Sequence, residues 1–139
     1  MNTDKVASFV GWIDSRHRPL LNLRFWPDKI VCALLDTGFN GYLLWETSEA
    51  GLAEFPGELT SLYESVAVAG TNILVNLAWA SIQWFGEEGV YIGVETFVAL
   101  SEKRRRPGDP SALLGTASLT GATVIADFAN GTLRIQQSG

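Results

Sequence analysis

The sequence has one cysteine, one histidine and few basic residues, and each shortage excludes a class of site. Cys32 has no second cysteine with which to form an internal disulfide, and it lies in the apolar run at 30–35, where we expect a buried strand thiol. His17 stands in a polar turn without another His or Cys beside it, so we interpret it as exposed. The usual serine and cysteine triads are therefore excluded, and we expect neither a metal nor a cofactor.

Long apolar runs are also missing. No run reaches the roughly 18 residues of a membrane span, and residues 1–5 do not contain a basic region followed by an apolar core. We therefore expect a cytoplasmic protein with no membrane partner.

Positive charge is scarce, with 10 Lys and Arg against 15 Asp and Glu and a net charge of −5. Because nucleic-acid-binding proteins concentrate Lys and Arg, we expect no nucleic-acid partner. The one basic run, at 103–106, precedes Pro107 and Gly108, and we interpret it as a solvated connector. A docking or self-cleavage site is the alternative for that run.

What the sequence does contain is strand-forming residues. A length of 139 residues with 47% hydrophobic residues suits a single domain over 1–139. Apolar stretches separated by Gly, Pro, Asn and Asp are typical of an all-β barrel or sandwich. We predict strands at 6–14, 19–26, 29–36, 41–45, 61–69, 72–85, 89–100, 122–128 and 131–136, a short helix at 48–52 and a helical turn at 116–120. Asn130 and Gly131 predict a hairpin between the last two strands.

The segment that carries chemistry is Ala33-Leu34-Leu35-Asp36-Thr37-Gly38. An apolar strand delivers a carboxylate to its end, a hydroxyl follows, and glycine lets the backbone turn tightly. An ordinary turn prefers the same residue types, so one hypothesis is an unrelated barrel in which Asp36 only stabilises a turn. Further along the chain comes Ala112-Leu113-Leu114-Gly115, followed by the predicted helical turn and the last two strands.

Together these segments resemble the retropepsin-like aspartic proteases, and in particular the small single-domain bacterial branch of that clan. The motifs that carry the resemblance are Gly11-Trp12-Ile13-Asp14, Leu35-Asp36-Thr37-Gly38-Phe39-Asn40-Gly41 and Leu113-Leu114-Gly115. They span nearly the whole chain in the family's order. The resemblance implies an all-β fold, a closed retropepsin-like β-barrel (the acid protease fold) with one or two short helices, in a homodimer.

The resemblance also implies roles for individual residues. Asp36 is the expected catalytic aspartate, Thr37 joins a hydrogen-bond grip between subunits beneath the two aspartates, and Gly38 lets the substrate backbone approach.

Two further segments are expected around this turn. The supporting strand behind it comprises Leu113, Leu114 and Gly115. The flap that closes over a bound peptide is expected at Val68, Ala69, Gly70 and Thr71.

One Asp-Thr-Gly turn implies two chains. Aspartic proteolysis needs two carboxylates over one water, and at a separation near 3 Å the pair shares a proton, so that one acts as base and the other as acid. Because the chain is too short for both lobes of a pepsin-like protein, the second Asp36 has to come from another copy across a two-fold axis. The N-terminal residues and the strand at 132–135 are the expected dimer seal.

The leading hypothesis is thus an aspartic endopeptidase, active as a homodimer on an extended peptide or protein substrate. The alternative is a non-catalytic dimeric module that uses the same fold for peptide binding or assembly. The five tryptophans lie in separate predicted strands, so we interpret them as core or dimer-interface residues rather than as a stacking platform. They are Trp12, Trp26, Trp45, Trp79 and Trp84.

Overall fold

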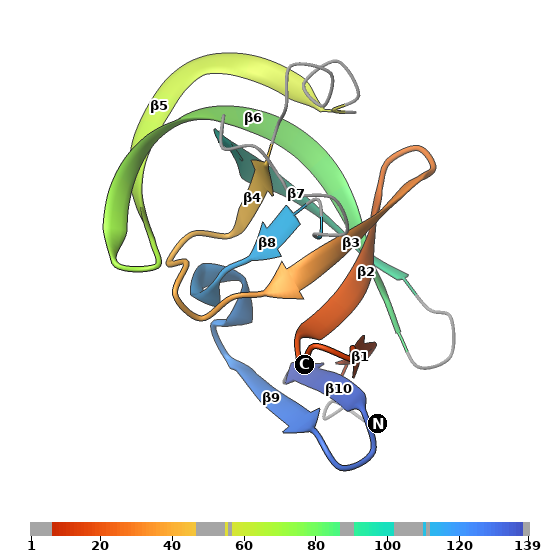
Figure 1. Cartoon of the computed structure of the whole chain (residues 1–139). Helices are drawn as coiled ribbons and strands as arrows, with labels where there is room; N and C mark the ends of the chain where they lie inside the picture. Colours follow the sequence, from red (N-terminus) through yellow and green to blue (C-terminus); the bar gives the residue numbers. More distant parts are fainter. Residues whose placement is uncertain are drawn as a thin grey trace.

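The computed structural model describes residues 7–46, 55, 57–86, 91–101, 110 and 112–137. Strands and one short 3-10 helix, η1, account for most of this part of the chain (Figure 1). In chain order the elements are β1 (Ala7–Ile13), β2 (Pro19–Phe25), β3 (Lys29–Leu35), β4 (Leu43–Glu46), β5 (Glu58–Val68), β6 (Thr71–Phe85), β7 (Tyr91–Ser101), β8 (Ala112–Leu114), η1 (Thr116–Leu119), β9 (Ala122–Asp127) and β10 (Thr132–Gln137).

The strands form a sheet that closes on itself. Their order is β5-β6-β7-β4-β8-β3-β2-β1-β10-β9, and β6 also pairs with β2. The ring β6-β7-β4-β8-β3-β2 is therefore a closed barrel. Strands β1, β10 and β9 extend the sheet beyond β2, while β5 pairs with β6 outside the ring. The all-β fold and the closed barrel predicted from the sequence are confirmed, whereas the homodimer stays a prediction.

Alternation of side chains places the main core inside the barrel. In β3 the side chains of Val31, Ala33 and Leu35 are buried, while the residues between them are less so, because successive strand residues point to opposite faces. Cys32 is one of those between, so it is half-buried rather than fully buried, and burial raises the pKa of its thiol. The largest cluster gathers such residues from most strands of the barrel.

A second, smaller cluster lies on the other side of the sheet. Strand β4 contributes to both clusters, with Leu43 and Trp45 in the larger and Leu44 in the smaller. Phe39, Val66 and Val75 join Leu44 in the smaller cluster, together with Ala99 and Leu113. This cluster therefore packs the β5–β6 hairpin onto the segment that follows Asp36.

The sequence predictions hold for most strands but not for every boundary. Strand β4 begins at Leu43 rather than at residue 41, and β5 begins at Glu58 rather than at residue 61. The predicted turn at 116–120 is η1, and the predicted hairpin joins β9 and β10 through a four-residue loop that ends at Gly131, whose φ is +69°. The predicted helix at 48–52 and the basic run at 103–106 lie outside the described residues.

The tryptophan interpretation holds in part. Trp45 and Trp84 are buried in the larger cluster, and Trp79 stacks edge-on against Phe97 with ring centroids 4.6 Å apart. Trp12 and Trp26 are exposed and are not core residues. His17 is exposed as predicted, with a left-handed φ of 62°.

Within the ranges that the structure describes, no helix combines the length and the apolar character needed to cross a lipid bilayer.

Candidate active site

Asp36 is the first residue after β3 and is fixed by its own turn. Its Oδ1 accepts a hydrogen bond from the backbone N–H of Gly38 at 2.9 Å. Its carbonyl oxygen accepts from the N–H of Phe39 at 3.2 Å, and its own N–H donates to the carbonyl oxygen of Leu114 at 3.0 Å. Asp36 is half-buried. Two backbone hydrogen bonds thus fix the main chain of Asp36 at the end of a rigid strand, and the bond from Gly38 sets the direction of its carboxylate.

Strand β8 lies directly behind this turn, between β3 and β4 (Figure 1). It runs parallel to β3, with Leu35 opposite Leu114, and antiparallel to β4, with Leu43 opposite Leu114. Leu114 is therefore paired on both sides by the strands that enter and leave the turn. Because Leu114 also accepts the hydrogen bond from Asp36, a shift of β8 would move the carboxylate.

The helical turn η1 holds the second half of the loop between β3 and β4. The N–H of Thr116 donates to the carbonyl oxygen of Phe39 at 2.9 Å, and the N–H of Ala117 donates to that of Gly41 at 3.2 Å. Tyr42 receives two bonds at its carbonyl oxygen, from the N–H of Gly115 at 3.0 Å and from the hydroxyl of Ser118 at 2.7 Å. The amides at the start of η1 thus satisfy loop carbonyls that have no strand partner.

The expected flap is a hairpin with a two-residue turn. Val68 of β5 pairs with Thr71 of β6, and the residues between them, Ala69 and Gly70, have φ values of 50° and 80°. Two successive positive φ values define the type I′ turn that suits the twist of paired strands. Apart from its two chain neighbours, no atom of the described residues lies within 4 Å of a Cβ placed on Gly70, so glycine is needed there for its backbone conformation.

The tip of this hairpin touches the Asp-Thr-Gly turn, as Figure 1 shows beside the loop that joins β3 and β4. The N–H of Ala69 donates to the carbonyl oxygen of Gly38 at 3.0 Å, and Phe39 forms an antiparallel bridge with Val68. Asn40 makes two bonds to Ala67: its N–H donates to the Ala67 carbonyl oxygen at 3.2 Å, and its Oδ1 accepts from the Ala67 N–H at 3.0 Å.

The structure thus brings most of the predicted site residues together. Gly38, Leu114, Gly115 and the hairpin residues Val68 and Ala69 all lie at or beside the Asp36 turn. Thr37 and Thr71 are exposed, and in the described part of the chain no hydrogen bond joins either of them to the turn.

Two contact residues were missed from the sequence, namely Asn40 and Ala67. The only available signal was an amide placed between Phe39 and Gly41, and that pattern is also typical of an ordinary turn.

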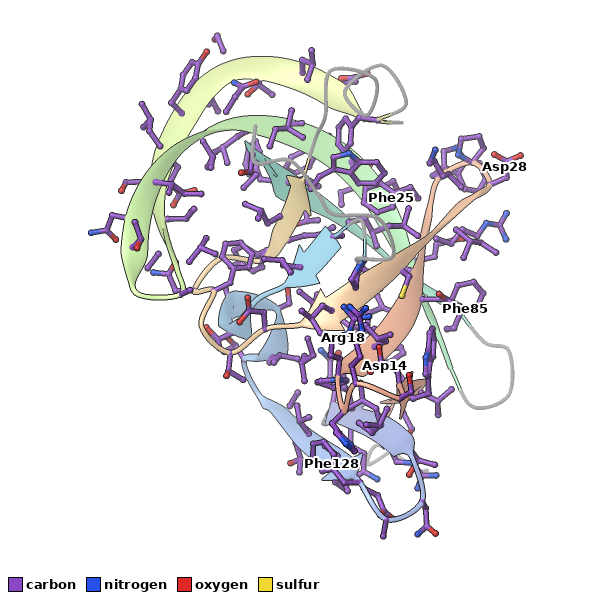
Figure 2. The ribbon with its side chains drawn as sticks, in the orientation of Figure 1. Asp14, Arg18, Phe25, Asp28, Phe85 and Phe128 are labelled. Atoms are coloured by element: carbon purple, nitrogen blue, oxygen red, sulfur yellow. The ribbon has the colours of Figure 1, made fainter. Side chains whose placement is uncertain are left out.

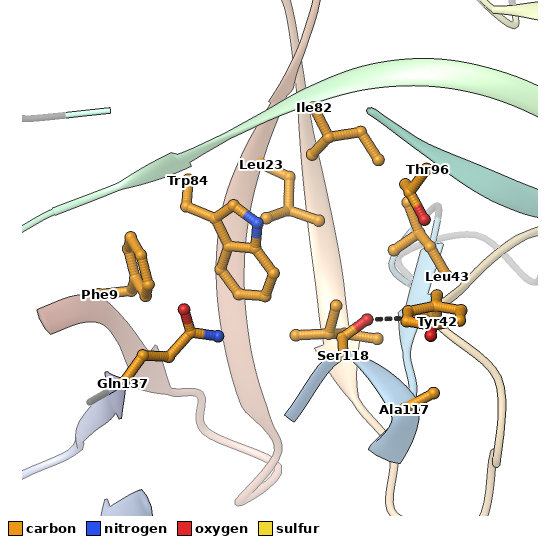
Figure 3. A pocket seen from close by; sticks show the side chains of 11 residues that line it. Phe9, Leu23, Tyr42, Leu43, Ile82, Trp84, Thr96, Ala117, Ser118 and Gln137 are labelled. Atoms are coloured by element: carbon orange, nitrogen blue, oxygen red, sulfur yellow. Dashed lines mark hydrogen bonds between the residues drawn. The ribbon is translucent and has the colours of Figure 1, made fainter. Parts of the chain in front are cut away.

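Two cavities flank the loop. A cavity of about 180 Å³ lies on the barrel side, between Trp84, Phe9 and Gln137 on one wall and Tyr42 and Ser118 on the other (Figure 3). Asp36 is not among its lining residues, so this space is part of the barrel interior rather than of the reacting centre.

The second cavity, of about 140 Å³, lies between the loop and the hairpin. Its lining includes Phe39 and Asn40 on one side and Glu64, Ser65 and Val66 on the other. This space adjoins the segment that follows Gly38, on the side where the hairpin tip is bound.

The opening motif Gly11-Trp12-Ile13-Asp14 supports the barrel through β1 and the turn that joins β1 to β2. Asp14 closes the β1–β2 turn: its Oδ1 accepts from the N–H groups of Arg16 and Arg18, and its Oδ2 pairs with Arg18 Nε at 2.8 Å. Figure 2 shows the two side chains next to each other. A Cβ on Gly11 would collide with the carbonyl oxygen of Leu20. This motif is therefore structural.

No protein-family model and no curated protein matches the chain. Among solved structures, the chain is similar to the crystal structure of a retropepsin-like aspartic protease from Rickettsia conorii. That match has a TM-score of 0.55 and 13% sequence identity, and it covers 100% of this chain and 98% of that one. The chain thus has the retropepsin-like fold, and the resemblance first found in three short motifs is confirmed at the level of the whole barrel.

Proposed function

We propose that this protein is an aspartic-type endopeptidase that acts as a homodimer. One observation carries the proposal: in a retropepsin-like barrel, the Asp-Thr-Gly turn stands at the end of β3 with Asp36 bonded to Gly38 and to Leu114 of the strand behind it. The fold and the position of the carboxylate are those that the chemistry needs.

The proposed reaction uses Asp36 from each of two subunits. The ionised carboxylate of the pair takes a proton from a water held between them, and that water attacks the carbonyl carbon of the scissile peptide bond. The protonated carboxylate donates to the carbonyl oxygen. The resulting gem-diol then collapses: the carboxyl group that took the proton from water gives it to the leaving nitrogen, and a gem-diol hydroxyl returns a proton to the other carboxylate. No acyl-enzyme forms.

Thr37 is proposed to bond across the dimer axis beneath the two carboxylates, and its exposure leaves it accessible to a second subunit. The proposed substrate is an extended segment of a peptide or protein, gripped by main-chain hydrogen bonds, with the β5–β6 hairpin as the flap. The cavity between the loop and β5 offers space for one substrate side chain. The cytoplasmic location stays a prediction.

The test is Asp36→Asn, which keeps the shape of the side chain and removes the base. Purified wild-type protein is incubated with an unfolded protein substrate between pH 4 and 8, and new chain ends are identified by mass spectrometry. We expect cleavage by the wild type and none by Asp36→Asn, with the same circular dichroism spectrum. The matched control is Asp28→Asn, an exposed aspartate in the β2–β3 turn, which leaves cleavage unchanged.

Unchanged cleavage by Asp36→Asn would eliminate the mechanism. The second candidate function is a non-catalytic dimeric peptide-binding module, and one observation favours it: Gly38 and Asn40 already bind the backbone of an extended segment, at Ala69 and Ala67 of the β5–β6 hairpin. Wild-type protein that binds peptides without cleaving them at any pH in this range would support the module instead.

A further inference from the structure

The hairpin tip contacts the Asp36 turn as a bound peptide strand would. Three main-chain groups of β5 and its turn take part: the N–H and the carbonyl oxygen of Ala67 and the N–H of Ala69. Their partners are Asn40 and the carbonyl oxygen of Gly38. The bridge between Phe39 and Val68 is antiparallel, so the two segments run in opposite directions, as two paired antiparallel strands do. The loop after Asp36 thus pairs with one short extended segment.

The pairing pattern of the hairpin explains why the N–H and the carbonyl oxygen of Ala67 are available to bond to Asn40. Val68 and Thr71 flank the two-residue turn, so they exchange hydrogen bonds with each other, and the next pair, Ala67 and Asn72, does not. The N–H and carbonyl oxygen of Ala67 therefore point away from β6. Because β5 is the last strand of the sheet order, no strand of the described chain lies along this outward edge, and Asn40 takes its place.

The hairpin occupies the approach to the carboxylate. A Cβ on Gly38 would lie 3.2 Å from Asp36 Oδ1 and 3.6 Å from the Cα of Ala69, so one small residue separates the hairpin backbone from the proposed catalytic oxygen. A peptide strand lying against Asp36 needs main-chain partners on this same edge. While Ala67 and Ala69 hold these groups, a substrate cannot bind them.

We propose that residues 67–69 are a built-in competitor for the peptide-binding edge, with Asn40 as the latch that holds them there. This inference rests on the proposed function. The hairpin tip has to leave Gly38 and Asn40 before an extended substrate binds, so the resting protein is autoinhibited. Ala69, Gly70 and Thr71 are exposed, so the main apolar contact that the tip gives up when it lifts is that of the half-buried Val68 with the smaller cluster.

The latch lowers the apparent affinity for peptides in a calculable way. A ligand that binds only the open hairpin has an apparent Kd equal to its intrinsic Kd divided by the open fraction. Weakening the latch increases that fraction and tightens binding without any new contact to the ligand. A substitution on the hairpin is the cleanest probe, because Asn40 lies on the proposed binding edge itself.

The test uses Ala67→Pro, which removes the N–H that donates to Asn40 Oδ1 and places a ring carbon there. Proline is tolerated on an edge strand where the lost N–H points outward. The control is Tyr63→Pro, four residues earlier on the same edge and outside the lining of the proposed substrate cavity, where no hydrogen bond to the turn occurs among the described residues. The probe is a statine-containing peptide, whose hydroxyl stands where the attacking water would be.

The expected result is about tenfold tighter binding of this peptide by Ala67→Pro than by the wild type, which corresponds to about 1.4 kcal/mol, and no change in Tyr63→Pro. Equal affinities for all three proteins would overturn the autoinhibitory contact and leave the proposed function intact. Failure of every variant, wild type included, to bind or cleave peptides would overturn the proposed function and this inference together.

Amide hydrogen exchange at Ala69 gives a readout independent of binding. This amide lies at an exposed tip and is protected only while it bonds to Gly38. We expect slow exchange in the wild type and in Tyr63→Pro, and fast exchange in Ala67→Pro and in a second variant, Asn40→Ala, which keeps its N–H but loses Oδ1. Fast exchange of the Ala69 amide in the wild type would contradict the proposal. A variant in which this amide exchanges fast but peptide binding is not tighter would also contradict it.

Discussion

Gly115 lies so close to the ring of Phe39 that a Cβ on Gly115 would be 2.6 Å from Phe39 Cδ2, and it would also collide with the carbonyl oxygen of Gly41. Gly115 has φ of −95° and ψ of 173°, an extended conformation that any residue adopts. Space rather than backbone conformation therefore requires glycine at the end of Leu113-Leu114-Gly115. The bulky residue after Asp-Thr-Gly and the glycine after β8 depend on each other.

We predict that Gly115→Ala lowers the free energy of unfolding by about 3 kcal/mol, the upper part of the usual range for overpacking, because most of the neighbouring atoms are backbone. Peptide cleavage falls with it, since β8 carries the carbonyl group that holds Asp36. Urea denaturation and a cleavage assay measure the two effects.

The control for this prediction is Gly121→Ala, where no atom lies within 4 Å of the new Cβ and φ is +77°. Its expected cost is about 1–2 kcal/mol from the left-handed backbone alone, with cleavage retained. Equal cleavage by the two variants would show that the contact between Gly115 and Phe39 does not position the turn.

We predict that Trp45 of the larger cluster contributes strongly to the free energy of unfolding. It is 4% exposed and packs edge-on against Phe25 and Phe55, with ring centroids 5.3 Å away in both cases. We expect Trp45→Ala to lower the free energy of unfolding by about 3–5 kcal/mol because it leaves a large cavity. Phe128→Ala, which removes an aromatic ring that is 58% exposed in the β9–β10 turn, is expected to change it by less than about 0.5 kcal/mol. Similar costs for both would contradict this core assignment.

Asp14 makes stability depend on pH. Hydrogen bonds from the backbone of Arg18, from its side chain and from the backbone of Arg16 hold the pKa of the Asp14 carboxyl below its ordinary value of 3.8. A folded-state pKa below the unfolded one gives stability that is present above pH 3.8 and is lost as the pH falls through the lower folded value.

We therefore expect Asp14→Asn to be less stable than the wild type near neutral pH and the two urea midpoints to converge as the pH approaches 2. Asp28→Asn, at an exposed turn, serves as the matched control. A constant difference between wild type and Asp14→Asn down to pH 2 would show that the carboxylate charge is not the cause.

The strands of the barrel were predictable because their signal is local. In β2 the apolar residues Leu21, Leu23 and Phe25 alternate with polar ones, and that period predicts which residues face the core. In β3 the residues at 30–35 are all apolar, so they predict a strand but not which of its faces is in the core. Strand β8 has only three residues and all are buried, so it carries no period. Only the family resemblance of Leu113-Leu114-Gly115 pointed to it.

The boundary of β4 could not be read from the sequence for a related reason. The carbonyl groups of Gly41 and Tyr42 bond to η1, so the strand begins only at Leu43. The turn at Asp36 was predicted because Asp, Thr and Gly act within one turn. The two bonds between Asn40 and Ala67 join residues 27 positions apart, and no local pattern encodes such a contact.

The central claim, that each active site needs Asp36 from two subunits, is tested most directly by mixing. Wild-type protein is allowed to exchange subunits with an equal amount of Asp36→Asn, and cleavage is compared with that of the same wild-type protein alone. If mixed dimers are inactive, random pairing leaves about half of the wild-type activity. Activity that stays undiminished after full exchange would mean that one subunit suffices, and the shared-carboxylate mechanism would be wrong.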